Sequence, residues 1–301
     1  SELPIQAGDT IGRDDVVNAV QALFASGNFE DVQLGRDGDD LAVVVAERPS
    51  IAKIELSGNK SIDEENLRKG LTEAGLAEGE VFQRSTLQAI AGELERQYVS
   101  QGRYGADIKT ESVALPRNRV ALKIEIYEGK AARIRDINIV GNQLFDDEEL
   151  LKDFELHSTG FWSFIKGDDK YSREKLSGDL ERLSSYYLDR GYINFSIEST
   201  QVSVTPDRRS VFITVNVAEG EQYTVNEVNL AGDLVVDEDQ LKPLVIVKKG
   251  QVFSQQLLTY TNDLIKRRLG NEGYTFAEVK GREHNPDDEK RTVDVTFYVD
   301  P

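Results

Sequence analysis

The sequence predicts an α+β protein built as a tandem array of β-α-α-β-β repeats, each a three-stranded mixed sheet covered by two helices. The main observation is a set of four glycines, each of which ends an amphipathic helical run and precedes a strand-like run: Gly27, Gly102, Gly191 and Gly273. They lie 75 to 89 residues apart. A unit that recurs at such a period indicates a repeat protein, in which each unit buries its own small core.

The first strand and first helix of a repeat are marked by a polar turn between them. Apolar runs lead to Gly-Asn or Gly-Asp at residues 58–59, 141–142 and 232–233, and acidic residues follow each turn. Carboxylates favour a helix start there, because they accept from its unpaired N–H groups and face the positive end of its dipole. Residues 61–64 also match a capping box that starts at Ser61.

The second helix and the two strands that follow are marked by the closing glycine. Four and eight residues before each glycine the chain is aliphatic or Tyr, which places these side chains on one helix face. Glycine suits the left-handed conformation that ends many helices. Two strand-like runs come next, and the second is the more apolar one, at residues 41–46, 120–126, 211–217 and 293–299.

These signals divide the chain into four parts, residues 1–48, 49–129, 130–220 and 221–301. In the last three parts the Gly-Asn or Gly-Asp turn precedes the closing glycine by 44, 50 and 41 residues, so the matching turn of the first part would fall before residue 1. We therefore expect an incomplete first repeat, without its first strand and most of its first helix, in a fragment of a longer protein.

The composition disfavours several classes of function. The net charge of −18 opposes binding to nucleic acid and to anionic lipid. There is no Cys, and the two histidines, His157 and His284, have no further Cys or His at ligand spacing. No nucleophile elbow, P-loop or dinucleotide-binding motif occurs. The sequence thus predicts no enzyme, no catalytic residue, no cofactor and no metal.

One strand of the third repeat differs from its counterparts by its lack of charge. Residues 192–204 contain only Glu198, whereas residues 104–113 and 274–283 carry three and four charged side chains. Charge normally protects an exposed edge strand from pairing with a foreign strand. We therefore predict a partner- or client-binding edge at Ile193, Asn194, Phe195, Ser196, Ile197, Glu198, Ser199, Thr200 and Gln201. The alternative is a strand that is central in its sheet or covered by a neighbouring element.

A second unusual segment of the same repeat is the long connection between its helices, which carries Phe161, Trp162 and Phe164. Three large aromatic side chains in a loop either form a small core of their own or mark a contact surface. We keep these residues as a secondary contact site.

Three motifs carry a resemblance to a known family. They are ALFASGNFEDV at residues 22–32, INIVGN at residues 137–142 and YYLDRGY at residues 186–192. Together with the order of the elements, they resemble polypeptide-transport-associated (POTRA) domains. The likeness is greatest to the POTRA regions of the outer-membrane β-barrel assembly factors of Gram-negative bacteria, and it extends over essentially the whole chain.

The resemblance implies a scaffold at the periplasmic face of the outer membrane that binds unfolded outer-membrane proteins. It further implies accessory outer-membrane lipoproteins and periplasmic chaperones as partners, and contact with the membrane only through a C-terminal barrel that lies outside this sequence. The predicted mechanism is β-augmentation, in which an extended segment pairs with an exposed strand edge. The alternative is the POTRA region of a related secretion transporter or translocation factor that recognises one dedicated client.

Overall fold

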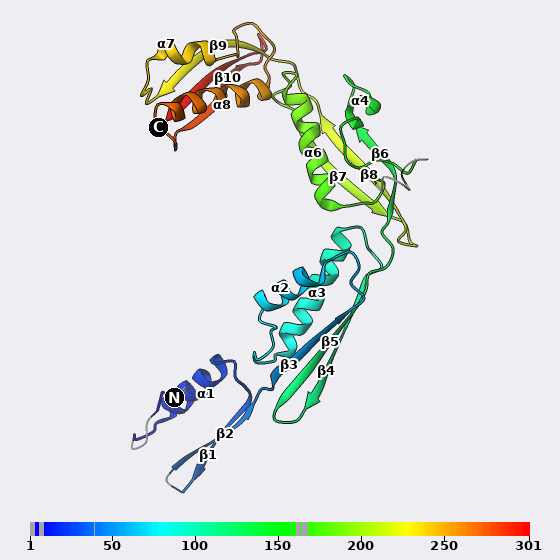
Figure 1. Ribbon diagram of the computed structural model, residues 1–301, viewed down its shortest axis with the longest axis vertical. Coiled ribbons are helices and arrows are strands. Elements are labelled where there is room, and N and C mark those ends of the chain that lie inside the picture. Colours follow the sequence, from blue (N-terminus) through cyan, green and yellow to red (C-terminus); the bar gives the residue numbers. More distant parts are fainter. Residues whose placement is uncertain (1–3, 6–8, 39, 161–162, 164–167) are drawn as a thin grey trace. The chain divides into compact units, whose positions relative to one another are not determined.

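The computed structural model describes residues 4–5, 9–38, 40–160, 163 and 168–301. The chain forms two compact units, Ser1–Lys130 and Ala131–Pro301. The elements of the first unit are α1 (Arg13–Ala25), β1 (Phe29–Asp37), β2 (Asp40–Glu47), β3 (Ser50–Ser57), α2 (Glu64–Glu73), α3 (Arg84–Ser100), β4 (Asp107–Leu115) and β5 (Arg119–Tyr127) (Figure 1).

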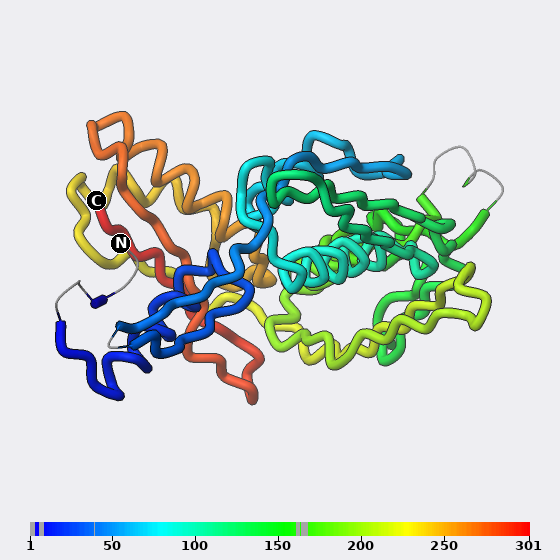
Figure 2. Tube along the Cα trace, turned by 90° about the horizontal axis from the view of Figure 1, so that it is seen from below, coloured from blue at the N-terminus to red at the C-terminus, as the bar shows by residue number. Residues whose placement is uncertain are grey.

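The second unit contains two sets of strands and helices, whose Cα path Figure 2 follows from green to red. The first set comprises β6 (Arg133–Val140), α4 (Asp147–Leu151), α6 (Arg173–Leu188), β7 (Ser196–Val204) and β8 (Ser210–Ala218). The second set comprises β9 (Thr224–Gly232), α7 (Glu238–Leu241), the 3₁₀ helix η1 (Lys242–Leu244), α8 (Gln255–Asn271), β10 (Glu278–Asp287) and β11 (Thr292–Asp300).

Three sheets share one strand order, in which the last strand of the set lies between the other two. The orders are β3-β5-β4, β6-β8-β7 and β9-β11-β10. The central strand is parallel to the first strand and antiparallel to the second. We call these sets, with their helices, modules 2, 3 and 4. The described part of the chain before them carries a two-stranded antiparallel sheet of β1 and β2. The predicted α+β fold with mixed three-stranded sheets is confirmed.

The core of module 3 lies between its central strand and α6. The side chains of Val211, Ile213 and Val215 on β8 are almost fully buried. They are covered from the helix side, where Leu183 and Tyr187 are also buried. These two residues lie four apart on the predicted apolar face and eight and four residues before Gly191, so the periodicity located the buried helix face correctly.

Glycine is required at the turn that follows the first strand of each module. Gly141 has a φ of +101°, and a Cβ added to it would lie 2.1 Å from the Val217 carbonyl oxygen. The equivalent distances are 2.0 Å at Gly58 and 2.2 Å at Gly232. Only glycine combines a left-handed backbone with such a close approach, because it has no side chain. The turn therefore lies directly against the end of the central strand.

The start of α2 differs from the sequence prediction. The capping box predicted at Ser61 is wrong, because the residue that caps the helix is Asp63, whose carboxylate accepts from the Glu65 N–H at 3.1 Å. Asp146 caps α4 in the same manner, by accepting from the Glu149 N–H at 2.8 Å. In both modules an aspartate five residues after the turn glycine starts the helix.

A buried glutamate joins the end of the central strand to the turn in modules 2 and 3. Glu219 accepts hydrogen bonds from the backbone N–H groups of Gln143, at 2.8 Å, and Leu144, at 3.2 Å. The hydroxyl of Tyr187 also donates to Glu219, at 2.8 Å. In module 2, Glu128 takes the equivalent place and accepts from the backbone N–H groups of residues 60 and 61 at 2.6 and 2.7 Å. In both modules the carboxylate therefore connects the end of the central strand to the turn after the first strand, and in module 3 it also binds the second helix through Tyr187.

We expect Glu219→Gln to lower the free energy of opening of module 3 by about 1–3 kcal/mol, because the amide replaces one of the two acceptor oxygens by an NH2 donor and leaves a buried donor without an acceptor. Native-state hydrogen exchange of the slowest β8 amides measures this quantity. The matched control is Glu198→Gln on the exposed strand β7, which should change it by less than about 0.5 kcal/mol. Equal effects of the two substitutions would contradict this role of Glu219.

The lowered pKa of Glu128 predicts that the stability of module 2 depends on pH. Burial acts to raise this pKa, but hydrogen bonds from the backbone N–H groups of Ser61 and Lys60, with the charge of Arg103, outweigh it and hold the pKa below its usual value. A carboxyl with a lowered folded pKa stabilises the fold above its unfolded pKa of about 4.3, and this contribution is lost as pH falls through the folded value.

The stability difference between the wild type and Glu128→Gln in module 2 should therefore shrink as the pH is lowered from about 6 to about 3. Hydrogen exchange of the β5 amides at a series of pH values measures it. A stability difference that stays constant with pH would show that the ionised carboxylate of Glu128 does not stabilise module 2.

Candidate partner-binding edge strand

Strand β7 lies at an edge of its sheet, as predicted. It pairs with β8 on one side, and no described strand pairs with its other side. The alternative of a central strand is therefore excluded by the sheet order. The opposite edge of the same sheet is formed by β6, so module 3 has two edge strands and one central strand.

The first three residues of the predicted site precede β7, which begins at Ser196. Ile193 packs against the hydrophobic core of module 4. The side-chain amide of Asn194 donates to the hydroxyl of Tyr223, at 3.3 Å. Both residues therefore belong to the junction between modules 3 and 4 and not to the paired strands β7 and β8.

Further hydrogen bonds at this junction hold the start of the strand in place. The Tyr223 N–H donates to the Gly191 carbonyl at 2.8 Å. The carboxylate of Asp189, which follows α6, accepts from the Gln256 N–H in the first turn of α8, at 2.7 Å. This hydrogen bond links the end of α6 in module 3 to the start of α8 in module 4, next to the residues that lead into β7.

Phe195 also has an internal role. Its ring stacks on that of the buried Tyr187, with centroids 4.1 Å apart and an interplanar angle of 10°. Phe145 and Tyr192 pack edge-on against the same tyrosine ring. A charged residue at position 195 would therefore disturb the core of module 3. Such a substitution cannot separate a loss of partner binding from a loss of folding stability.

The backbone groups that face away from the sheet can be assigned from the hairpin between β7 and β8. The Thr205 N–H donates to the Ser210 carbonyl at 2.9 Å, which makes this a hydrogen-bonded pair. In an antiparallel ladder, bonded and non-bonded pairs alternate. Counting back through the register, the N–H and C=O groups that point to the open edge belong to Thr200, Val202 and Val204.

The side chains along this edge remain uncharged except at one point. A β-bulge lies between Ile197 and Ser199, and it contains the exposed Glu198. From Ser199 to Val204 the edge has no charge. By contrast, charged residues on the equivalent strands form ion pairs, Glu111 with Lys123 in module 2 and Glu278 with Lys280 in module 4. Of the second strands in the three modules, β7 is the least protected by charge.

The structure thus places the open edge a few residues further along the chain than the site predicted from the sequence. Ser196, Ile197, Glu198, Ser199, Thr200 and Gln201 lie on β7, whereas Val202 and Val204 were left out although their backbone groups face the open edge. Alternation counted back from the polar turn at residues 205–210 could have found them. The secondary site at Phe161, Trp162 and Phe164 lies outside the described residues.

The described residues contain neither a cluster of metal ligands nor a membrane-spanning helix. Within them, no group of three or more His, Asp or Glu side chains is arranged to hold a metal ion. Across the same residues, no helix is both long and apolar enough to span a membrane.

Comparison with curated proteins shows similarity over almost the whole chain. It is 31% identical over 301 residues to the "Outer membrane protein assembly factor BamA" of Neisseria meningitidis serogroup B, covering 99% of this chain and 38% of that protein. It is 28% identical over 298 residues to the protein of the same name from Buchnera aphidicola, covering 99% of this chain and 48% of the relative. The chain therefore spans less than half the length of these relatives.

A solved structure and a family model are also similar to this chain. The crystal structure of Haemophilus influenzae BamA POTRA3-5 covers 84% of this chain and 96% of its own, with 20% identity and a TM-score of 0.49. The family model described as "POTRA: Surface antigen variable number repeat" matches residues 49–129, 132–220 and 223–301. Since these three matches take up most of its length, the chain belongs to the POTRA family.

Proposed function

We propose that this chain is the periplasmic POTRA region of an outer-membrane β-barrel assembly factor and that it binds extended segments of other proteins by β-augmentation on β7. The ligands are unfolded outer-membrane proteins and accessory lipoproteins of the assembly complex, with periplasmic chaperones as the donors of clients. The names of the relatives, which are assembly factors and not enzymes, support this proposal. They also favour it over the POTRA region of a secretion transporter with a single client.

The observation that carries the mechanism is the open, uncharged edge between Ser199 and Val204. Its outward groups alternate along the strand, at Thr200, Val202 and Val204. An extended segment can pair with such an edge through its backbone, so its side chains need not match a fixed pattern. This suits clients whose sequences differ but whose chains all form strands.

The energetics suit a transient contact. Each backbone hydrogen bond contributes only about 1 kcal/mol net, because both partners give up hydrogen bonds to water. Three outward residues offer a donor and an acceptor each, and ordering the client segment opposes their sum. The edge should therefore hold a client weakly and release it readily, as transfer to another site requires.

Thr200→Pro tests the edge most selectively, because it removes an outward N–H without removing a ladder hydrogen bond. We expect a β-strand peptide derived from an outer-membrane protein to bind about fivefold more weakly, which corresponds to the loss of about 1 kcal/mol. Fluorescence anisotropy with a labelled peptide measures the change, and circular dichroism checks the fold.

The matched control is Thr110→Pro in module 2, because Thr110 pairs with Ile124 as Thr200 pairs with Val215 at the equivalent position of module 3. On β4 it is flanked by Lys109 and Glu111, so this edge should bind little peptide and the control should leave the affinity unchanged. Equal losses for both variants, or no loss for Thr200→Pro, would refute binding at β7.

A further inference from the structure

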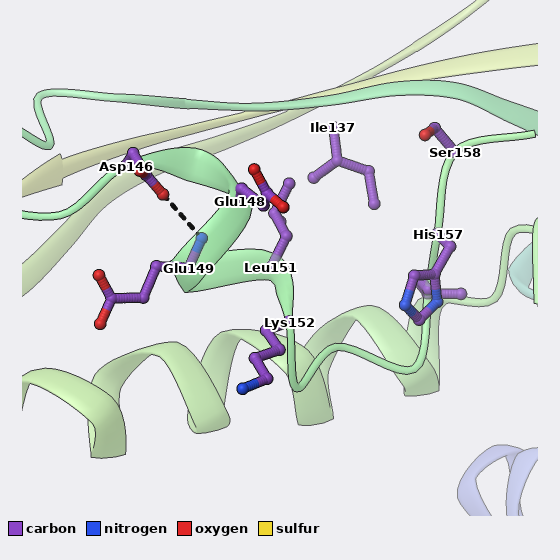
Figure 3. A pocket seen from close by; sticks show the side chains of 9 residues that line it. Ile137, Asp146, Glu148, Glu149, Leu151, Lys152, His157 and Ser158 are labelled. Carbon is purple, nitrogen blue, oxygen red and sulfur yellow. Dashed lines mark hydrogen bonds between the residues drawn. The ribbon is translucent and has the colours of Figure 1, made fainter.

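A second surface of module 3 lies next to the other edge strand, β6. A groove of about 780 Å³ runs between α4 and the segment of residues 156–158. Its apolar floor is formed by Ile137, Leu151 and Leu156. Figure 3 shows Glu148 and Leu151 on the side of α4 that faces Ile137, with His157 and Ser158 on the opposite side of the opening.

The edge beside this groove has backbone groups without strand partners. The N–H and C=O of Ile134 bond to the connection that follows α4, through the Asp169 carbonyl at 2.7 Å and the Thr159 N–H at 2.8 Å. These hydrogen bonds occupy the outward backbone groups only at the start of β6, at Ile134. In the remainder of β6, no described strand occupies the side opposite β8.

Module 2 shows what closes the same place in a neighbouring repeat. Ile54 lies four residues before Gly58, as Ile137 lies four before Gly141. The guanidinium of Arg68 donates to the Ile54 carbonyl at 3.4 Å and pairs with Glu64 at 2.8 Å. Arg68 thus covers an outward carbonyl of β3 and places a charge beside that edge.

Module 3 has Leu151 where module 2 has Arg68, because each lies five residues after the aspartate that caps the helix. The Ile137 carbonyl therefore lacks the guanidinium that its counterpart Ile54 receives, and the leucine adds apolar surface. In module 4 the equivalent residue is Lys242, which pairs with Glu238 and Asp239. Of the three modules, only module 3 combines an apolar residue at this position with the open edge.

The charges around the groove indicate the side chains that it favours. Asp146, Glu148 and Glu149 line it, against a single lysine, Lys152, which points away from Ile137 in Figure 3. Asp146 caps α4, and Glu149 accepts from the Tyr186 hydroxyl. Glu148 has no ion pair with any described residue, so its carboxylate is available to a ligand.

We infer that β6 is a second docking edge, which takes an extended client segment with an apolar side chain in the Ile137–Leu151–Leu156 groove and a Lys or Arg beside Glu148. This rests on the proposed function and adds a sequence preference to it. Backbone pairing supplies the attachment, as at β7, while the groove and the carboxylate discriminate among segments. Module 3 can then hold one client at two edges, which increases retention without strengthening either contact.

Photocrosslinking distinguishes the two edges in the whole chain. A benzoylphenylalanine at Ser158 reports on the groove, and one at Thr200 reports on β7. The probe is a ten-residue labelled peptide of alternating valine and threonine with one lysine. We expect Leu151→Arg, which copies module 2, to reduce crosslinking at position 158 at least tenfold and to leave crosslinking at position 200 unchanged. Replacing the lysine of the peptide by glutamate should reduce crosslinking at position 158 several-fold.

The reciprocal change keeps the test decisive if Leu151→Arg impairs folding. Arg68→Leu should open the groove of module 2 and increase crosslinking at Glu78. This position is equivalent to Ser158, because the next residue, Gly79, donates to the Ile51 carbonyl as Thr159 donates to the Ile134 carbonyl. Wild-type crosslinking at position 200 but not at 158, or no effect of either substitution, would overturn the β6 site alone. Crosslinking at 158 but not at 200 would refute the proposed binding at β7 and support the β6 site.

Discussion

The position of the last strand in the middle of each three-stranded sheet determines which backbone groups of a module remain without a strand partner. Because β5, β8 and β11 pair on both sides, the first and second strands of every module become edges. A buried glutamate secures this order in modules 2 and 3, where it fastens the end of the central strand to the turn after the first strand. The fold thus exposes two strand edges per module, and side-chain chemistry decides which of them can accept a partner.

Module 3 differs from the others in the side chains that lie along its two edges. Its β7 edge has hydroxyl, amide and aliphatic side chains where β4 and β10 carry ion pairs, and its β6 edge has Leu151 where module 2 has Arg68. The start of β7 is held by the junction with module 4, through Ile193 and Asn194. A client on β7 would therefore meet a preorganised strand, which reduces the entropy lost on binding.

The sequence predicted the repeat order and the edge position of β7 but not the detailed limits of the site. Strands and buried helix faces follow from apolar periodicity and from glycines that no other residue can replace, such as Gly141. The roles of Ile193 and Phe195 could not be predicted, because their alternation with polar residues is the same whether they face a partner, another module or Tyr187. The inference about the groove beside β6 depends on the difference between Leu151 and Arg68. These two positions can be compared only once the structure identifies Asp63 and Asp146 as the residues that cap the helices.

The most direct test of pairing at β7 is residue-resolved amide exchange in the presence of a β-strand peptide. Pairing on the open edge predicts slower exchange at Thr200, Val202 and Val204, whose N–H groups face outward. Gln201 and Ser203, whose N–H groups already bond to β8, should change little. Uniform protection along the strand, or none at the three outward residues, would contradict backbone pairing at this edge.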